Sequence, residues 1–361
     1  MVERHFRYAL VCILFLVMLL ISSTQCGKNE PNKGLNSMMD QSVAESDSNL
    51  AFEYNKMIGK GVNIGNALEA PFEGAWGVRI EDEYFEIIKK RGFDSVRIPI
   101  RWSAHISEKP RYDIDRNFLE RVKHVVDRAL ENNLTVIINT HHFEELYKEP
   151  DKYGDVLVEI WRKIAKFFRD YPENLFFEIY NEPAQNLTAE KWNELYPKVL
   201  KVIRESNPTR IVIIDAPNWA HYSAVRSLKL VNDKRIIVSF HYYEPFKFTH
   251  QGAEWVNPIP PVGVKWNGEE WEINQIRSHF KYVSDWAKQN NVPIFLGEFG
   301  AYSKADMDSR VKWTESVRKM AEEFGFSYAY WEFCAGFGIY DRWSQNWIES
   351  LATAVVDIGK E

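Results

Sequence analysis

The sequence predicts an α/β fold, a single-domain (β/α)8 TIM barrel. Short runs rich in β-branched and aromatic residues alternate with segments of helical period, and eight such runs occur. The runs are almost continuously apolar, which is typical of parallel strands covered on both faces. A doubly wound open sheet is the alternative. However, the first run and the residues after it, 61–66, lack the third glycine of a nucleotide-binding turn.

The N-terminal segment, residues 1–26, is predicted to be a signal peptide. Basic residues within Met1–Arg7 precede an apolar run, Tyr8–Ile21, that is short for a membrane span. Cys26 follows shortly after this run, as in bacterial lipoproteins, although Gln25 and Ser23 depart from the usual lipoprotein pattern. A lipid anchor through Cys26 and plain secretion therefore both stay open. Either way, we expect the protein outside the cytoplasm, as a secreted protein or a cell-surface lipoprotein.

Residues 27–50 are predicted to be a disordered polar tether, because they have almost no apolar periodicity and cannot offset their ordering entropy by burial. Residues 51–361 show no second change of composition and are expected to form the one catalytic domain. Cys334 is the only cysteine in that domain, so no intrachain disulfide is expected.

The predicted strands and helices alternate along this domain. The strands are Gly61–Gly65, Ser95–Ile100, Leu134–Thr140, Leu175–Tyr180, Arg210–Asp215, Arg235–Tyr242, Pro293–Gly297 and Ser327–Phe333. Predicted helices between them include Asp82–Arg91, Phe118–Asn132, Val156–Arg169, Ala189–Ser206, Trp271–Gln289 and Ala305–Phe324. This order predicts parallel pairing, and eight repeats close naturally into a barrel.

The composition narrows the class of partner. The chain has 45% hydrophobic residues, 27% charged residues and a formal net charge of -6, as in ordinary soluble proteins. Nucleic-acid binders carry a basic face that neutralises phosphates, so no nucleic-acid partner is expected. Neutral ligands stay compatible with this charge, and we expect a monomer.

Polar side chains lie at the carboxyl end of nearly every predicted strand. In a (β/α)8 barrel the loops after the strands meet at one face, so these residues are the functional candidates. They are Asn66 and Glu69 after strand one, Arg97 in strand two, His141 and His142 after strand three, Asn181 and Glu182 after strand four, His241 and Tyr243 at strand six, Glu298 at strand seven and Trp331 at strand eight.

Glu182 and Glu298 are the candidate catalytic pair. Breaking a glycosidic bond requires one carboxylic acid to protonate the leaving oxygen and one carboxylate at the anomeric carbon. Strands four and seven are three apart around a ring of eight, so both side chains could reach a single bond. A lone strand-end glutamate would more simply cap a helix or pair with a cation. Two of them, accompanied by Asn, Arg, His and Tyr at other strand ends, favour catalysis.

The other candidates fit supporting roles. Arg97 could hold Glu298 ionised, and Tyr243 could donate a hydrogen bond to the same carboxylate. Glu182 must keep its proton before the first step, which requires partly apolar surroundings. Asn181 suits a sugar hydroxyl, and His241 could tune Glu182. Each of these residues could also make a purely structural hydrogen bond.

No metal or other cofactor is expected. Adjacent side chains on a strand normally face opposite ways, so His141 and His142 do not form a ligand pair by themselves. No His-x-His or His-Glu-x-x-His spacing completes a ligand set.

At these residues the sequence resembles glycoside hydrolase family 5, the cellulase family, from about Gly59 to Leu351. The residues that carry the resemblance are Arg97 in Val-Arg-Ile-Pro, His141, Asn181-Glu182-Pro183, His241-x-Tyr243, Glu298 and Trp331. Residues 61–70, 241–246, 252–255 and 330–338 look like the branch of bacterial endoglucanases with mannanase side activity. The resemblance implies a metal-free retaining mechanism with a glycosyl-enzyme on Glu298, and carboxyl groups about 5–5.5 Å apart.

The resemblance also implies sugar contacts. Asn66, Glu69 and His142 would line the glycone subsites, with Trp331 as the floor beneath the sugar that is attacked. Phe246 and Trp255 lie in the long segment after strand six, where they could form a lip over the leaving group or simply pack the loop.

The activity expected is endo cleavage of β-1,4 linkages in cellulose-type or mixed-linkage glucans. Glucan and mannan differ in the orientation of one hydroxyl, so an endo-β-1,4-mannanase or a dual glucanase and mannanase stays open. The non-enzymatic alternative is a cell-surface barrel that binds polysaccharide. It is disfavoured because both carboxylates are present.

Overall fold

The computed structural model describes residues 50–357. The predicted signal peptide, Cys26 and all but the last residue of the predicted tether lie outside this range. Leu50, which we placed in the tether, is instead the first residue of a helix over residues 50–58 and is partly buried. Within the range described, no helix has both the length and the apolarity needed to cross a membrane.

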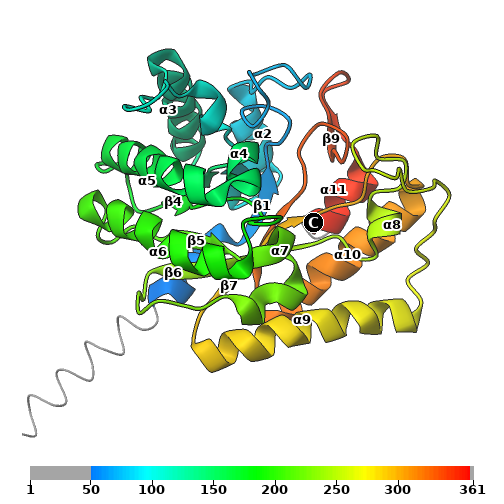
Figure 1. Cartoon of the computed structure of the whole chain (residues 1–361). Helices are drawn as coiled ribbons and strands as arrows, with labels where there is room; N and C mark the ends of the chain where they lie inside the picture. The colour runs from blue at the N-terminus through cyan, green and yellow to red at the C-terminus, as the bar shows by residue number, and fades with distance from the viewer. Residues whose placement is uncertain (1–49, 358–361) are drawn as a thin grey trace, which may run out of the picture. The chain divides into compact units, whose positions relative to one another are not determined.

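Eight parallel strands close into a barrel in chain order, from β1 to β8 and back to β1, which confirms the predicted fold class (Figure 1). They are β1 (Lys60–Asn63), β2 (Ser95–Ile98), β3 (Thr135–Asn139), β4 (Leu175–Glu178), β5 (Val212–Asp215), β6 (Ile236–Tyr242), β7 (Ile294–Phe299) and β8 (Ser327–Tyr330). All of their residues except Lys60 are buried, as expected for parallel strands covered by helices.

The helices surround this barrel, with α9 along the lower edge of Figure 1 and α5 and α6 side by side on the left. The main ones are α2 (Glu83–Lys90), α3 (Arg116–Glu131), α5 (Pro150–Phe167), α6 (Ala189–Ser206), α9 (Glu270–Asn290), α10 (Met307–Phe324) and α11 (Glu349–Val355). Shorter elements are η1 (Trp102–His105), α4 (Glu144–Lys148), α7 (Pro217–Ala220), η2 (Tyr222–Ser227), α8 (Phe246–Thr249) and the hairpin of β9 (Tyr340–Asp341) and β10 (Asn346–Trp347).

The predicted elements all occur, but several boundaries differ. Seven strands end where predicted or up to three residues earlier. Strand β7 instead continues to Phe299, so Glu298 lies inside it rather than after it. Helix α5 begins at Pro150, six residues before the predicted start. Proline at the first turn of a helix needs no backbone donor there.

The end of the barrel where the strands begin is closed by the helix over residues 50–58. Tyr54 and Ile58 pack on inward-facing strand residues such as Ile137 and Phe295, which form a small separate core. Asn55 fixes the helix, because its amide donates to the carbonyl of Ile294 at 3.1 Å and its side-chain oxygen accepts from Ser327 at 2.7 Å. This plug leaves the opposite end, where the strands finish, as the one with room for a site.

Candidate active site

Arg97 is the centre of a buried polar network at the carboxyl ends of the strands. Its Nε and Nη2 donate to the two oxygens of Glu178 at 2.7 and 2.6 Å. Its Nη1 donates to Glu298 Oε1 and to Asn63 Oδ1, both at 2.8 Å, and Nη2 also donates to Asn181 Oδ1 at 2.6 Å. The guanidinium has no solvent exposure. Arg97 on β2 is therefore tied to three other strands, β1, β4 and β7, which fixes the direction of each of these side chains.

Glu298 lies on β7 and is held by two donors. Arg97 contacts one carboxylate oxygen, and the Tyr243 hydroxyl donates to the other at 2.9 Å, as predicted. As expected, Arg97 favours the ionised form of Glu298. Burial nevertheless raises the pKa of Glu298, opposed by His241 and Arg97 and reinforced by the nearby Glu182. The Arg97 charge is already shared with a second carboxylate, so burial prevails.

A register shift places His241 beside Glu298. Between β6 and β7, Phe240 pairs with Leu296 but the next pair is His241 with Glu298, so Gly297 is skipped. A Cβ atom at Gly297 would lie 2.8 Å from His241 Nε2, and only glycine leaves room for the ring. The irregularity turns both functional side chains toward the same face of the sheet.

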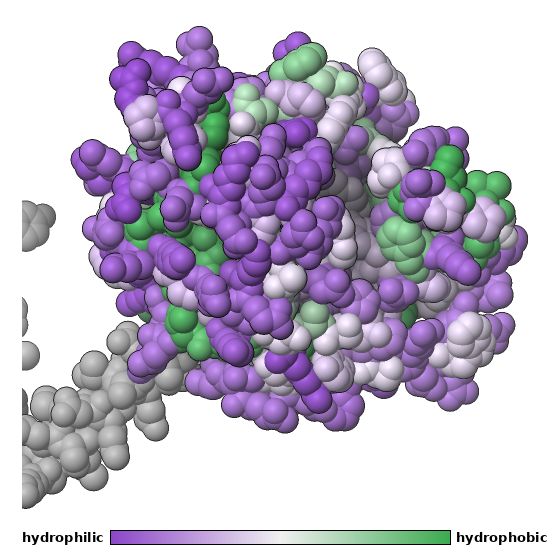
Figure 2. Space-filling model, in the orientation of Figure 1, coloured by the Kyte–Doolittle hydropathy of each residue, from purple (hydrophilic) through white to green (hydrophobic). Residues whose placement is uncertain are grey.

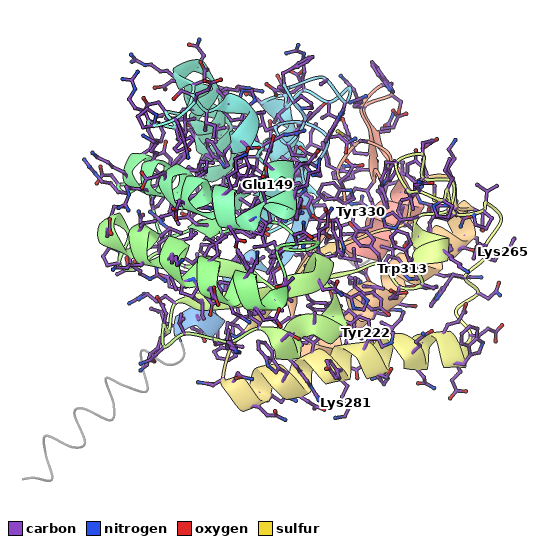
Figure 3. The ribbon with its side chains drawn as sticks, in the orientation of Figure 1. Glu149, Tyr222, Lys265, Lys281, Trp313 and Tyr330 are labelled. Carbon is purple, nitrogen blue, oxygen red and sulfur yellow. The ribbon has the colours of Figure 1, made fainter. Side chains whose placement is uncertain are left out.

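The residue after Glu298 anchors the end of β7. Phe299 packs against Tyr330 of β8 at 5.4 Å and against Trp313 of α10 at 6.4 Å, measured between ring centroids. Figure 3 labels Tyr330 and Trp313. Because these large rings are buried, the backbone that carries Glu298 has little freedom.

Glu182 follows β4 and is held more loosely. Its side chain is 21% exposed, and Oε1 lies 2.8 Å from His241 Nδ1. Its backbone N–H donates to Asp215 Oδ2 at 3.0 Å, with Glu182 itself in a left-handed conformation at φ 53°. Burial raises the pKa of Glu182 to about 7, which agrees with the environment that we expected for a group that must keep its proton.

Glu182 and Glu298 converge as predicted. The nearest ligand atoms of Glu182, His241 and Glu298 all lie within 4.8 Å of one another. This spacing is close to the value of about 5–5.5 Å for retaining glycosidases and shorter than the roughly 6.5–9.5 Å of inverting enzymes, which must fit a water between their carboxyl groups.

The same three residues could in principle surround a cation, and they are the one such group found within residues 50–357. Arg97 argues against this use, because its Nη1 lies 2.8 Å from Glu298 Oε1 and would repel a metal ion there. His141 Nδ1 contacts the Asn139 amide at 3.1 Å, so this nitrogen already has a partner. The expectation of no metal or other cofactor stays a prediction.

Trp331 and His141 form one wall of the site. Their rings are stacked with centroids 5.8 Å apart, and Trp331 is partly exposed. A Cβ atom at Gly65 would lie 3.0 Å from the Trp331 ring, so glycine at the end of β1 lets the indole lie across the barrel mouth. This position fits the predicted floor beneath a sugar.

Asn66, Glu69 and His142 occupy different environments. Asn66 and His142 are partly exposed, and burial lowers the pKa of His142 to about 4. Glu69, in contrast, has no exposure, and its carboxylate accepts from the backbone amides of Asn66 and Ala67. Its placement does not fit the predicted sugar contact, because both oxygens organise the loop that presents Asn66.

Phe246 and Trp255 gather around one histidine after β6. Phe246 is stacked on His250 at 4.2 Å between centroids, and Trp255 lies edge-on to the same ring at 6.4 Å. His250 in turn contacts Tyr243, the donor to Glu298. The two aromatic residues are 41% and 60% exposed, so they suit the predicted lip. Figure 2 shows apolar side chains gathered over this region, which also presents Ile259 and Val262.

Sequence reasoning missed four buried polar residues, namely Asn63, Asn139, Glu178 and Asp215. They share one signal: each is a polar residue in a strand that otherwise reads as apolar. It also missed two exposed indoles, Trp76 in the segment after β1 and Trp219 in α7. Trp76 lies edge-on to His142 at 5.5 Å, and Trp219 is tilted against Tyr147 at 5.6 Å.

Comparison with known proteins agrees with this geometry. Endoglucanase H of Acetivibrio thermocellus is 38% identical over 284 residues, which cover 78% of this chain. The match spans 30% of the length of that relative. A solved structure titled endoglucanase is 96% identical with a TM-score of 0.85, covering 85% of this chain and 99% of the other.

The solved Cel5A of Thermotoga maritima is 48% identical with a TM-score of 0.84, covering 85% of this chain and all of the other. The family model described as Cellulase (glycosyl hydrolase family 5) matches residues 57–336. With a closed eight-stranded barrel and two glutamates facing one another at its mouth, this chain belongs to glycosyl hydrolase family 5, the cellulase family.

Proposed function

We propose that this protein is a retaining endo-β-1,4-glucanase. The observation that carries the proposal is the separation of Glu182 and Glu298, whose nearest carboxyl oxygens lie within 4.8 Å. That spacing suits direct attack by a carboxylate on the anomeric carbon and leaves no room for a water between the two groups.

In the first step, Glu298 attacks the anomeric carbon while Glu182 protonates the departing oxygen. Arg97 donates to one oxygen of Glu298 and Tyr243 to the other, and together they orient the attacking carboxylate. With a pKa of about 7, Glu182 holds its proton at neutral or weakly acidic pH and can still release it.

In the second step, the ionised Glu182 removes a proton from water, and that water displaces the sugar from Glu298. The positive charge that develops on the sugar ring is next to the two carboxylates, while Trp331 lies beneath the ring. Attack from opposite faces in two successive displacements returns the anomeric centre to its original β configuration.

We propose β-1,4-glucan as the main substrate and β-mannan as a second substrate. Solved structures of Thermotoga maritima Cel5A, which is 48% identical, are titled as complexes with cellobiose and with mannotriose. Side-by-side rates on carboxymethylcellulose, barley β-glucan and glucomannan would rank these substrates. Faster cleavage of mannan than of both glucans would reverse the proposed order.

The experiment that tests the catalytic proposal is NMR observation of the first product formed from cellopentaose. We expect the new reducing end to appear as the β anomer before mutarotation. First appearance of the α anomer would overturn the retaining mechanism, and absence of any cleavage would favour the polysaccharide-binding alternative.

We propose that the protein acts outside the cytoplasm, on the basis of the leader-like residues 1–26. The expectation of a monomer is a separate one. Radiolabelled palmitate would label the expressed full chain if Cys26 is lipidated, and Cys26→Ser would abolish the label. No label, with protein in the medium, would indicate plain secretion, and light scattering would test the monomer.

A further inference from the structure

Asp215, at the end of β5, is a fully buried carboxyl group to which the mechanism above gives no role. Its Oδ2 accepts the backbone N–H of Glu182 at 3.0 Å and lies 3.7 Å from His241 Nε2. His241 Nδ1, on the other side of the ring, lies 2.8 Å from Glu182 Oε1. Asp215 therefore reaches Glu182 twice, directly through the backbone and indirectly through the imidazole.

Three buried polar atoms at this place have no hydrogen-bond partner within the described residues: Asp215 Oδ1, His241 Nε2 and Ser239 Oγ. They are neighbours, because Ser239 pairs with Asp215 in the sheet and both Ser239 Oγ and His241 Nε2 border Gly297, where a Cβ would lie 2.7 and 2.8 Å from them. Unpaired buried polar atoms are costly, so a proton shared among them is favoured.

We propose that Asp215 is a positioning residue that stays protonated and neutral, donates to His241 Nε2, and thereby keeps the imidazole proton on Nδ1, facing Glu182. The inference rests on the proposed role of Glu182 as acid and base. A rotation that closes the 3.7 Å gap completes the bond, since catalytic hydrogen bonds are often long in enzymes without substrate.

The charges around Asp215 favour its neutral form. Burial raises the pKa of Asp215 well above its ordinary value, and the neighbouring Glu178 carboxylate adds to this, against the lowering effects of Arg97, the Glu182 backbone N–H and Ser239. The groups that face Asp215 and His241 are Arg97 on β2, Glu178 on β4, Glu182 after β4, Ser239 on β6, Glu298 on β7 and His141 after β3. A second full negative charge beside Glu178 would be costly in this dry interior.

The imidazole itself stays neutral, because burial lowers the pKa of His241 to about 4. Its single proton can then lie on either nitrogen, and the group bonded to the other nitrogen decides which. With the proton on Nδ1, His241 donates to Glu182 and stabilises the carboxylate that acts as base in the second step. Without Asp215 this preference is lost.

The test compares Asp215→Asn with Asp215→Leu in the full chain. The Asn side chain is neutral and its amide can donate to His241 Nε2, as a protonated Asp would, whereas Leu has no donor. The first measurement is the tautomer of His241 by ¹⁵N NMR of histidine-labelled protein, with the signal assigned by its loss in His241→Asn. We expect a proton on Nδ1 in the wild type and in Asp215→Asn, and loss of this preference in Asp215→Leu.

A proton on Nε2 in the wild type, or a change of tautomer in Asp215→Asn, would overturn the proposal by showing that Asp215 is ionised. This readout needs no activity, so it stays informative if the proposed glucanase function fails or if Asp215→Leu does not fold. The second measurement is the pH profile of kcat with a 2,4-dinitrophenyl cellobioside, for which the base step limits the rate.

We expect Asp215→Asn to retain kcat within about threefold. We expect Asp215→Leu to lose about tenfold in kcat and to shift the Glu182 limb to higher pH by about one unit, since the carboxylate loses its donor. An unshifted limb in a folded Asp215→Leu would also overturn the proposal, because a merely structural residue would leave the profile in place.

Discussion

The two catalytic glutamates have the same side chain but opposite surroundings. Glu298 is 5% exposed and accepts hydrogen bonds from Arg97 and Tyr243 on its two oxygens, and the strand that carries it is fixed by packed rings. Glu182 lies on a loop in a left-handed conformation, with a side chain 21% exposed and His241 as its side-chain partner.

This difference matches the two tasks that we propose. A nucleophile reacts faster when it is held in one orientation, because the entropy of orienting it has already been lost before the reaction begins. An acid that becomes a base must exchange protons with a leaving group and then with water, which requires access and a pKa near the working pH. The surroundings of Glu298 therefore hold its carboxylate in one orientation, whereas those of Glu182 allow it to exchange protons.

The largest effect that we predict is the loss of activity in Glu298→Gln. Without a nucleophile, no glycosyl-enzyme forms, so kcat on cellopentaose should fall by at least about 10⁴-fold. Calorimetric binding of cellotetraose should persist, because the amide fills the same space. Glu205→Gln on the exposed side of α6 is the matched control and should keep full activity. Residual turnover above about 1% in the purified variant would contradict the assigned role.

Removal of the acid and base should have a smaller effect that depends on the leaving group. Glu182→Gln should lower kcat on cellopentaose by about 10³-fold, because general acid catalysis is lost. With a 2,4-dinitrophenyl cellobioside the first step needs no acid, so a glycosyl-enzyme should accumulate, and azide should restore turnover. An equal loss on both substrates, without azide rescue, would mean that the two glutamates do not divide the work as proposed.

Arg97→Lys tests whether the orientation of the Glu298 carboxylate depends on the several donors of the planar guanidinium. Lysine keeps the charge but cannot contact Glu178, Glu298 and Asn181 together, so kcat should fall by about 10²-fold. The loss should be in kcat more than in KM, since Arg97 is buried below the cleft. Thermal unfolding measured in parallel separates a catalytic loss from misfolding. A variant that folds and works normally would show that the charge alone suffices.

The barrel and its catalytic pair were predictable because their signals are local. Eight apolar runs set the strands, and Glu182 and Glu298 stand at the ends of two of them. The skipped residue at Gly297 was not predictable, since a bulge arises from packing between strands rather than from the pattern within one. That bulge is what brings His241 opposite Glu298.

The net rise in the pKa of Glu298 was not predictable for a related reason. From the sequence, Arg97 had one carboxylate to pair with, whereas the folded barrel gives it two, because Glu178 of β4 also faces inward. Which inward residues share a layer depends on the stagger of the strands, which a single sequence does not reveal. Glu69 was misplaced similarly, because its loop folds back on its carboxylate.

The pH dependence of kcat/KM should report the titration of Glu182 and of Glu298 separately. Glu182 must be protonated in the first step, so kcat/KM on cellopentaose should fall about tenfold per unit above pH 7, the pKa expected from its burial. Glu298 must be ionised, and its pKa is raised by burial, so the acid limb should lie above the ordinary range of a glutamate. With the dinitrophenyl cellobioside as substrate, the basic limb of kcat/KM should disappear while the acid limb remains. Persistence of both limbs would assign the basic one to a group other than Glu182.

The smallest effect that we predict is that of Tyr243→Phe, which removes a single donor to Glu298 at 2.9 Å. One hydrogen bond to a charged group accounts for about 1.5–3 kcal/mol, so kcat should fall about tenfold or somewhat more. The acid limb of the profile should also move to higher pH, because the carboxylate loses a bond that favours ionisation. Tyr302→Phe is the matched control, since that hydroxyl contacts the exposed Glu254 instead. If Tyr243→Phe moved the basic limb rather than the acid limb, Tyr243 would act on Glu182. The proposed contrast between a fixed Glu298 and a proton-exchanging Glu182 would then be wrong.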